Sequence, residues 1–230
     1  MRLVLFDIDG TLLNSGGMGR ASMQRALGMV FGSPGNPSYR YDGKTDKQIV
    51  RDVMRLEGHS DEHIDARMEK LIGLYLEGLR EGAKSGKFNV RPLEGVVELL
   101  DALEARDDVV LGLLTGNVES GARTKLKAAG IDPDRFRVNA FGSDHEHRPE
   151  LPAIAQRRAS ETLGLDIAGE RLVVIGDTPA DIECGRALGA RAIGVASGHY
   201  TVEQLQAHDP YAVFPSLKNT EQVLETILNA

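Results

Sequence analysis

The stretch "FDIDGTLLN", residues 6–14, places two aspartates, Asp7 and Asp9, directly after a short apolar run, Arg2–Phe6. A nearly continuous apolar run of this length predicts a strand that is buried on both faces of a sheet. Two carboxylates so close together repel each other, and burying either one without a partner is costly. A cation between them, or a division of labour between a nucleophile and an acid, would resolve that conflict.

The same strand pattern recurs along the chain and alternates with helical patterns. Apolar residues with helical spacing lie between the strands, at residues 94–105 and again at residues 151–163. Strands that alternate with helices imply right-handed βαβ units, so we predict an α/β fold with a doubly wound, Rossmann-like parallel sheet. The further strands predicted are Val109–Leu114, Arg171–Ile175 and Ala190–Val195, with weaker candidates at Phe136–Phe141 and Tyr211–Phe214.

Residues 16–89 break this alternation. They contain no convincing buried strand but three amphipathic stretches, which are Gly19–Phe31, Asp46–Leu56 and Asp61–Leu79. Segments rich in glycine and small polar residues, at 14–19 and 81–90, flank these stretches and are typical of linkers. We therefore predict a small all-helical cap domain, residues 16–89, inserted after the first strand of a core that comprises residues 1–15 and 90–230.

Composition narrows the class of protein. With 41% hydrophobic and 27% charged residues in a chain of 230, the sequence is that of an ordinary globular protein. A net charge of −7 argues against nucleic acid or an anionic membrane surface as a partner. The single cysteine, Cys184, cannot form an intrachain disulfide, and no stretch approaches the ~20 apolar residues of a membrane span. We expect a cytoplasmic protein that is a monomer or a homodimer.

Polar side chains follow four of the predicted strands at the point where each strand ends. In an open parallel sheet, ligands bind at the carboxyl ends of the strands. A lone aspartate in such a place is often only a helix cap, but that explanation is weak for the whole set. The side chains that the topology would gather at this edge are those of Asp7, Asp9, Thr115, Asp177, Asp181 and Ser197.

Three motifs at these strand ends are shared with a known family. They are Asp-x-Asp-Gly-Thr-Leu at residues 7–12, Thr-Gly-Asn at residues 115–117 and Gly-Asp-x-x-x-Asp at residues 176–181. Together with the helical insertion, they resemble the phosphatases of the haloacid dehalogenase superfamily. The subgroup that the sequence resembles most is the phosphoglycolate-phosphatase-like one, and the motifs extend over nearly the whole chain.

The resemblance implies a chemistry for the first motif. Asp7 would attack phosphorus and become an aspartyl phosphate, while Asp9 would act as general acid and then as general base. Mg²⁺ prefers oxygen ligands, so we assign it to Asp7, the backbone carbonyl of Asp9, and Asp177. Asp181 would be either a further ligand or a partner that supports the ligands. Such a cation would remove most of the repulsion between the first two aspartates.

The transferring phosphoryl group also needs donors for its other oxygens. The expected donors are Thr115 and the backbone amides of Gly10, Thr11, Gly116 and Asn117. The family normally adds a lysine, but the corresponding stretch here, "DHEHRPELPAIAQ" at residues 144–156, carries Arg148 instead. Arginine is always charged and presents two donors to phosphate, so we assign that catalytic role to Arg148, with Lys125 and Arg157 as alternatives.

The segment "YDGKTDKQIV", residues 41–50, resembles one found in caps of the same subgroup. Thr45 would cap the helix that follows, and Lys44 would contact the anionic end of the substrate. The flanking linkers would act as hinges that close the cap and exclude water. The implied partner is a small phosphorylated metabolite. Phosphoglycolate is the leading substrate, with a sugar phosphate or pyrophosphate close behind.

Other classes of protein share some of these features. Dehalogenases and phosphonatases of the superfamily lack an acid at the position of Asp9, so this residue favours phosphate esters. A sugar phosphomutase shares all the parts described and stays open. A catalytically decayed binding protein is favoured only by Arg148. Phosphorylated receiver domains are much shorter, lack a cap and accept phosphate on a middle strand of the sequence, so they fit poorly.

Overall fold

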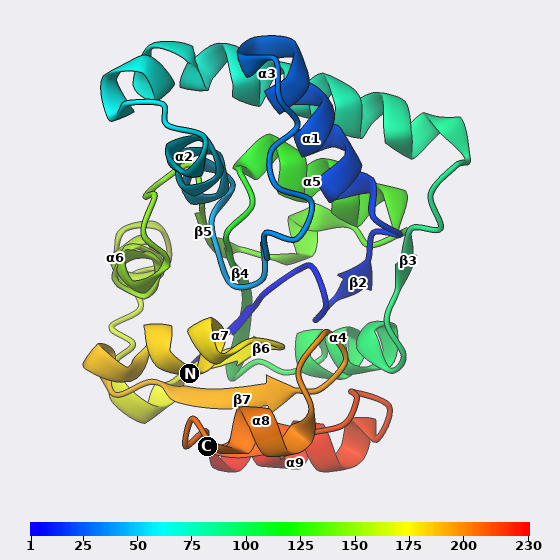
Figure 1. The fold of residues 1–230 in the computed structure, drawn as a ribbon. Helices are drawn as coiled ribbons and strands as arrows, with labels where there is room; N and C mark the ends of the chain where they lie inside the picture. Colours follow the sequence, from blue (N-terminus) through cyan, green and yellow to red (C-terminus); the bar gives the residue numbers. More distant parts are fainter.

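The computed structural model describes all 230 residues of the chain. At its centre lies one parallel sheet of six strands. The strand order is β5–β4–β1–β6–β7–β8, so the first strand lies between β4 and β6 (Figure 1). The strands are β1 (Arg2–Phe6), β4 (Val109–Thr115), β5 (Val138–Phe141), β6 (Leu172–Gly176), β7 (Arg191–Val195) and β8 (Ala212–Phe214). The predicted doubly wound α/β fold is confirmed, and both weaker strand candidates are part of the sheet.

Helices cover both faces of the sheet because successive residues of a strand point to opposite faces. In β1, Val4 and Phe6 pack with α4 (Val96–Glu104), α5 (Glu119–Ala128) and α9 (Thr220–Asn229), whereas Leu3 and Leu5 pack with α6 (Leu151–Leu163) and α7 (Pro179–Cys184). All four side chains are fully buried, which explains the unbroken apolar run. The core helices are α4 (Val96–Glu104), α5 (Glu119–Ala128), α6 (Leu151–Leu163), α7 (Pro179–Cys184), α8 (Val202–Gln206) and α9 (Thr220–Asn229), with 3₁₀ turns at Pro133–Arg135, Arg148–Glu150, Gly169–Arg171 and Arg186–Leu188.

The three helices of the predicted cap region stand over the edge of the sheet where the strands end (Figure 1). They are α1 (Met18–Phe31), α2 (Asp46–Leu56) and α3 (Asp61–Ser85). Their buried apolar side chains form a cluster of their own, which Val118 of the core joins. Thr45 caps α2 as predicted, since its hydroxyl oxygen accepts a hydrogen bond from the Gln48 N–H at 3.1 Å.

Helix α3 continues to Ser85, beyond Leu79, where the sequence pattern placed its end. The glycine at position 82 suggests a linker because glycine is a poor helix former. In the structure a Cβ on Gly82 would lie 2.9 Å from Cγ of Met18, so this glycine lets α1 and α3 pack closely. Neither α3 nor any other helix is long and apolar enough to cross a membrane.

A short antiparallel ribbon, which the sequence did not predict, joins the two linkers. β2 (Leu13–Asn14) pairs with β3 (Arg91–Pro92), so the chain leaves and re-enters the core side by side. Strands of two residues are too short to show a periodicity. On this basis we propose that residues 1–15 and 90–230 form the core and that residues 16–89 form the cap.

Truncating Leu27 of α1 tests how strongly the cap depends on its own apolar cluster. Leu27 is fully buried, so Leu27→Ala is expected to lower the free energy of unfolding by about 2–5 kcal/mol through lost burial and a residual cavity. Met29→Ala on the same helix is the control, because Met29 is 57% exposed. Urea denaturation followed by circular dichroism measures both variants, and equal small losses would contradict the assignment.

Candidate active site

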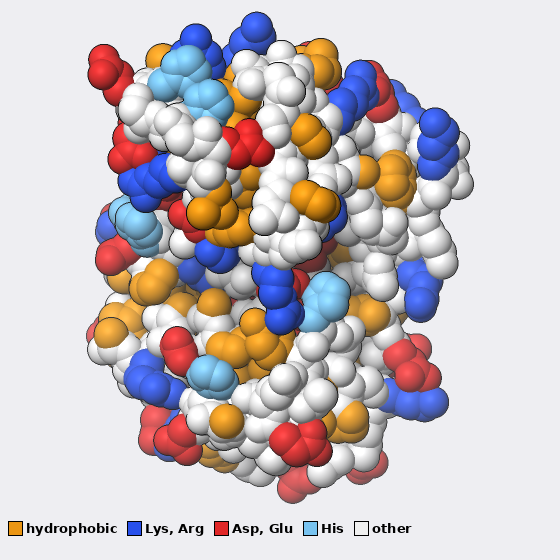
Figure 2. Space-filling model, in the orientation of Figure 1, with side chains coloured by type: hydrophobic (Ala, Val, Ile, Leu, Met, Phe, Trp, Pro, Cys, Tyr) orange, Lys and Arg blue, Asp and Glu red, His pale blue; other side chains and the backbone are white.

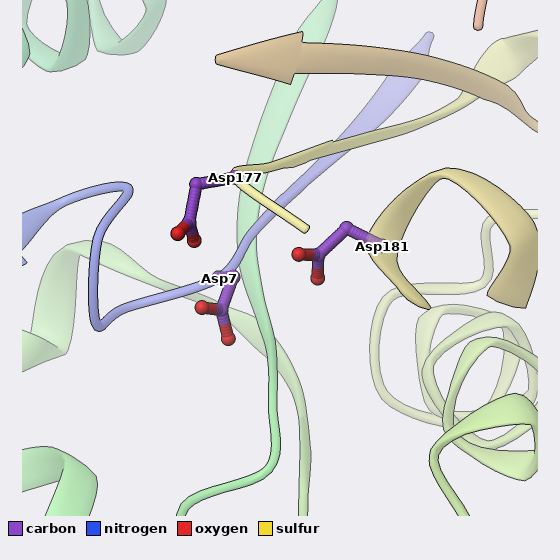
Figure 3. A group of neighbouring side chains, drawn as sticks. All are labelled: Asp7, Asp177 and Asp181. Carbon is purple, nitrogen blue, oxygen red and sulfur yellow. The ribbon is translucent and has the colours of Figure 1, made fainter. Parts of the chain in front are cut away.

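Three buried aspartate carboxylates lie together at the carboxyl edge of the sheet (Figure 3). Asp7 follows β1, Asp177 follows β6, and Asp181 lies in the first turn of α7. One carboxylate oxygen from each residue lies within 4.8 Å of those of the other two. The parallel pairing of β1 with β6 produces this convergence, because both strands end at the same edge.

The cluster carries unfavourable electrostatics. Burial raises the pKa of Asp7 to about 6 although Arg148 opposes the rise, and the carboxylates of Asp181 and Asp9 add to it. Burial, Asp181 and Asp7 likewise raise the pKa of Asp177 well above its ordinary value. An all-oxygen set of this kind suits a hard divalent cation, whose charge would relieve both the repulsion and the cost of burial. The three carboxylates could therefore hold a divalent metal ion.

Gly10 turns the chain directly after the two aspartates of the first motif. Its φ is +84°, where glycine is favoured, and a Cβ there would lie 2.3 Å from Oδ2 of Asp177. The N–H groups of Gly10 and Thr11 donate to carbonyls within this turn. The Thr11 hydroxyl donates to Oδ1 of Asp177 at 3.1 Å. Both N–H groups are thus engaged in the turn, and the hydroxyl is the part that reaches the acidic cluster.

Arg148 enters the cluster from the 3₁₀ turn that follows β5. Its guanidinium donates to Oδ1 of Asp7 at 3.0 Å and to the Leu114 carbonyl at 3.1 Å, and it pairs with Asp181. Although burial opposes it, the two carboxylates raise the pKa of Arg148, which is only 4% exposed. The sequence alternative Arg157 is instead an exposed residue of α6. Arg148 is therefore the cation that lies against the predicted nucleophile.

Asp9 belongs to a second polar group, beside the acidic cluster. Its Oδ2 accepts hydrogen bonds from Nζ of Lys125 at 2.6 Å and from Nδ2 of Asn117 at 2.9 Å. Burial alone would raise the pKa of Asp9, but the charge of Lys125, with the hydrogen bonds from Lys125 and Asn117, lowers it below its ordinary value. The two aspartates of one motif are therefore driven in opposite directions by their surroundings.

Thr115 and Gly116 complete the loop after β4. Thr115 is fully buried, and its hydroxyl oxygen accepts a hydrogen bond from Nδ2 of Asn117 at 2.8 Å. The Asn117 N–H faces the same oxygen at 3.4 Å. The N–H of Gly116 takes part in no hydrogen bond within the protein. It is thus a free donor on a residue that lines the same cavity as Asp7 and Asp177.

A cavity of about 450 Å³ lies between the cap and the core over these groups. In Figure 2 basic, acidic and histidine side chains gather along the hollow between the two parts. Lys44 lines the cavity, but its ammonium donates to the Tyr39 hydroxyl at 2.6 Å and to Asp52 at 2.8 Å within the cap. The other polar cap residues that line the cavity are Arg20, Tyr41, Asp42, Asp46 and Tyr75.

Residues 4–195 match the family model of haloacid dehalogenase-like hydrolases. The chain belongs to this family. It is 28% identical to a phosphoglycolate phosphatase of Thiobacillus denitrificans, over 94% of this chain and 92% of that protein. It is 27% identical to a 5'-nucleotidase of Pseudomonas aeruginosa, over 97% of this chain and 95% of that protein. The predicted phosphatase of phosphoglycolate-phosphatase-like type is confirmed.

The fold is also that of other solved structures. A putative β-phosphoglucomutase from Bacteroides vulgatus superposes with a TM-score of 0.70 at 21% identity, covering 100% of this chain and 89% of that one. Its likeness concerns the fold, because sequence identity is low.

Sequence reasoning named Lys125 of this hydrolase only as a substitute for Arg148, whereas the structure places it on Asp9. A signal for this was present in the sequence. On α5 the buried side chains are those of Ala122, Lys125 and Leu126, at the spacing of one helix face. A lysine within an apolar stripe is rarely buried without a partner.

Removing the Lys125 charge tests the electrostatics of this hydrolase directly. Lys125→Met is expected to raise the pKa of Asp9 from its lowered value, because the cation that opposes the cost of desolvation is lost. A ¹³C NMR titration of the Asp9 carboxylate measures the shift. Lys127→Met, an exposed change on the same helix, is the control and should leave that pKa in place. An unshifted pKa in Lys125→Met would refute the coupling.

Proposed function

We propose that this protein hydrolyses a small phosphomonoester with Mg²⁺, through an aspartyl phosphate formed on Asp7. The observation that carries the proposal is the pairing of two aspartates with two different cations. Arg148 holds Asp7, and Lys125 holds Asp9. Asp7 thereby lies among the carboxylates that suit a metal ion. Asp9 lies beside them and pairs with a different cation, Lys125.

In the first step an Asp7 oxygen bonds to phosphorus while the bond from phosphorus to the leaving oxygen breaks. Arg148 occupies Oδ1 of Asp7, which leaves Oδ2 for the attack. With a pKa of about 6, Asp7 is mostly ionised at neutral pH. The leaving oxygen takes its proton from Asp9. A phosphate dianion bound beside Asp9 raises the pKa of that carboxyl and so allows it to hold this proton.

In the second step a water molecule attacks the phosphorus of the aspartyl phosphate, and Asp9 accepts the proton of that water. The bond from phosphorus to the Asp7 oxygen breaks, and inorganic phosphate leaves. Lys125 favours the ionised form of Asp9, which suits its role as base. Mg²⁺, held by Asp7, the Asp9 carbonyl and Asp177, would neutralise charge on the phosphate oxygens.

The remaining assignments follow from the contacts. Both Asp181 oxygens already accept hydrogen bonds, one from Arg148 and the other from the N–H and hydroxyl of Thr178, so we assign Asp181 as a partner that supports the ligands. The free N–H of Gly116, with Thr115, would hold the phosphate oxygens that do not react.

A cavity of about 450 Å³ supports a small metabolite as substrate. Phosphoglycolate is one candidate, since a relative of similar length is a phosphoglycolate phosphatase. Contact between Lys44 and the anionic end of such a substrate would require its ammonium to exchange Asp52 for the ligand. The position of Arg148 on Asp7 supports an active enzyme over a decayed binding protein.

Asp7→Asn tests the nucleophile. It is expected to abolish phosphate release while the fold stays intact, because the amide cannot attack phosphorus but preserves the shape of the side chain. Phosphate release from a panel of small phosphomonoesters, phosphoglycolate included, is measured with Mg²⁺ and with EDTA. Metal-dependent release by the wild type and none by the variant are expected.

Two outcomes would contradict this proposal. An active Asp7→Asn variant would remove the nucleophile assignment. Isomerised sugar phosphate without net phosphate release would indicate a phosphomutase instead of a hydrolase. Thermal unfolding of the variant serves as the check on its fold.

Arg148→Ala tests the buried cation. Loss of the charge beside Asp7 is expected to lower kcat/KM by a factor of the order of 10², because the developing charge on phosphate loses its donor. Arg157→Ala is the matched control, since Arg157 is exposed on α6. Kinetics with one good substrate measure both variants. A wild-type rate in Arg148→Ala would move this role to another residue.

A further inference from the structure

The cap segment Gly43–Asp46 lies directly on the loops of the core that carry the site. A Cβ on Gly116 would lie 2.1 Å from the Lys44 carbonyl oxygen, so the two backbones are in contact. Thr45 is fully buried, and its hydroxyl donates to the Glu146 carbonyl at 2.6 Å. The segment therefore packs on the loop after β4 and on the loop that leads to the buried arginine. Its backbone is docked, while the Lys44 ammonium is paired within the cap.

Asp46 makes two hydrogen bonds with the loop after β4. Its N–H donates to the Gly116 carbonyl at 2.8 Å, and its Oδ2 accepts from the Val118 N–H at 2.8 Å. Asp46 is 6% exposed and is the first residue of α2. We call these two bonds the Asp46 clamp. They hold both ends of a three-residue loop whose middle residue is Asn117.

The clamped loop contacts Asp9 and lines the cavity that Asp7 and Asp177 also line. Asn117 donates to Asp9 at 2.9 Å and to the Thr115 hydroxyl oxygen at 2.8 Å. The Gly116 N–H has no hydrogen-bond partner in the protein, and Gly116 lines the cavity together with Asp7 and Asp177. A shift of this loop would therefore move two groups together. One is the Gly116 N–H, which would donate a hydrogen bond to phosphate, and the other is the Asn117 side-chain amide, which donates to Asp9.

We propose that Asp46 is a positioning residue that sets the phosphate-binding loop, and that this loop reaches its working geometry only when the cap rests on the core. The inference rests on the proposed function. Asp46 belongs to the cap and its two partners belong to the core, so the clamp exists only in the closed arrangement. The site thus completes itself as the cap closes, whichever leaving group the substrate carries.

A positioning role for Asp46 predicts a different kinetic result from a role in which Asp46 contacts the substrate. The phosphoryl end is common to every substrate, so Asp46→Ala is expected to lower kcat by the same factor, about 10–100-fold, for all esters. The probes are p-nitrophenyl phosphate, phosphoglycolate and glycerol 2-phosphate. Orthovanadate, which lacks a leaving group, is expected to inhibit the variant more weakly by a similar factor. Asp46→Asn keeps an acceptor for Val118 and should retain at least about a third of the wild-type kcat.

Asp61→Asn is the matched control, because Asp61 is the first residue of α3 and its ion-pair partners, Arg51 and Arg55, both belong to the cap. Its kinetics should equal those of the wild type. If Asp46→Ala fails to fold in a thermal scan, Asp46→Ser replaces it, since that side chain is too short to reach Val118. The inference is wrong if kcat is unchanged, if the loss occurs with one ester only, or if Asp46→Asn is as impaired as Asp46→Ala.

Failure of the proposed function would give a different experimental result from failure of the role assigned to Asp46. In that case the wild type itself releases no phosphate from any ester. Equilibrium binding of orthovanadate with Mg²⁺ then still tests the clamp, because it needs no turnover. Weaker binding by Asp46→Ala than by Asp61→Asn supports the clamp, and equal binding overturns it.

Discussion

Negative charge is concentrated at the end of β1, and the surrounding helices and loops are arranged around it. The carboxylates of Asp7, Asp177 and Asp181 are buried there, and that of Asp9, whose side chain is 37% exposed, lies beside them. Such a group is tolerated only when cations lie close by. The fold supplies two from the protein itself, each 4% exposed, and its oxygen ligands suit a third from solution.

The two protein cations come from opposite directions and divide the motif between them. Arg148 arrives from the turn after β5 and lies on Asp7, whereas Lys125 arrives from α5 and lies on Asp9. This separation produces one aspartate with a raised pKa and one with a lowered pKa only two residues apart. The conflict that the sequence raises is thus settled by a cation for each carboxylate, which is the asymmetry that a nucleophile and a proton carrier need.

The cap covers the site and also contributes contacts to the loops that form it. Its segment Gly43–Asp46 crosses the loop after β4 so closely that only glycine fits at position 116. Across the same boundary, Arg51 of α2 pairs with Glu146 of the core at 2.5 Å. Cap and core therefore share hydrogen bonds at the loops that carry the site, and the apolar cluster of the cap takes in Val118. A lid that only excluded water would not need these contacts.

Apolar runs, helical spacing and three short motifs were enough to predict the sheet, the insertion and the acidic edge, because these depend on local pattern and on the rule that parallel strands end together. The ribbon of β2 and β3 and the last six residues of α3 were not predicted, since strand pairing and close helix packing override weak local preference. Which cation serves which aspartate was also beyond the sequence. Arg148 and Lys125 lie 23 positions apart in the chain, and only the packing of α5 and of the turn after β5 brings each to its own carboxylate. The residues of the chain thus specify which charges must be neutralised, but the partner of each charge depends on the packing of the folded protein, because burial and distance set the strength of every such pair.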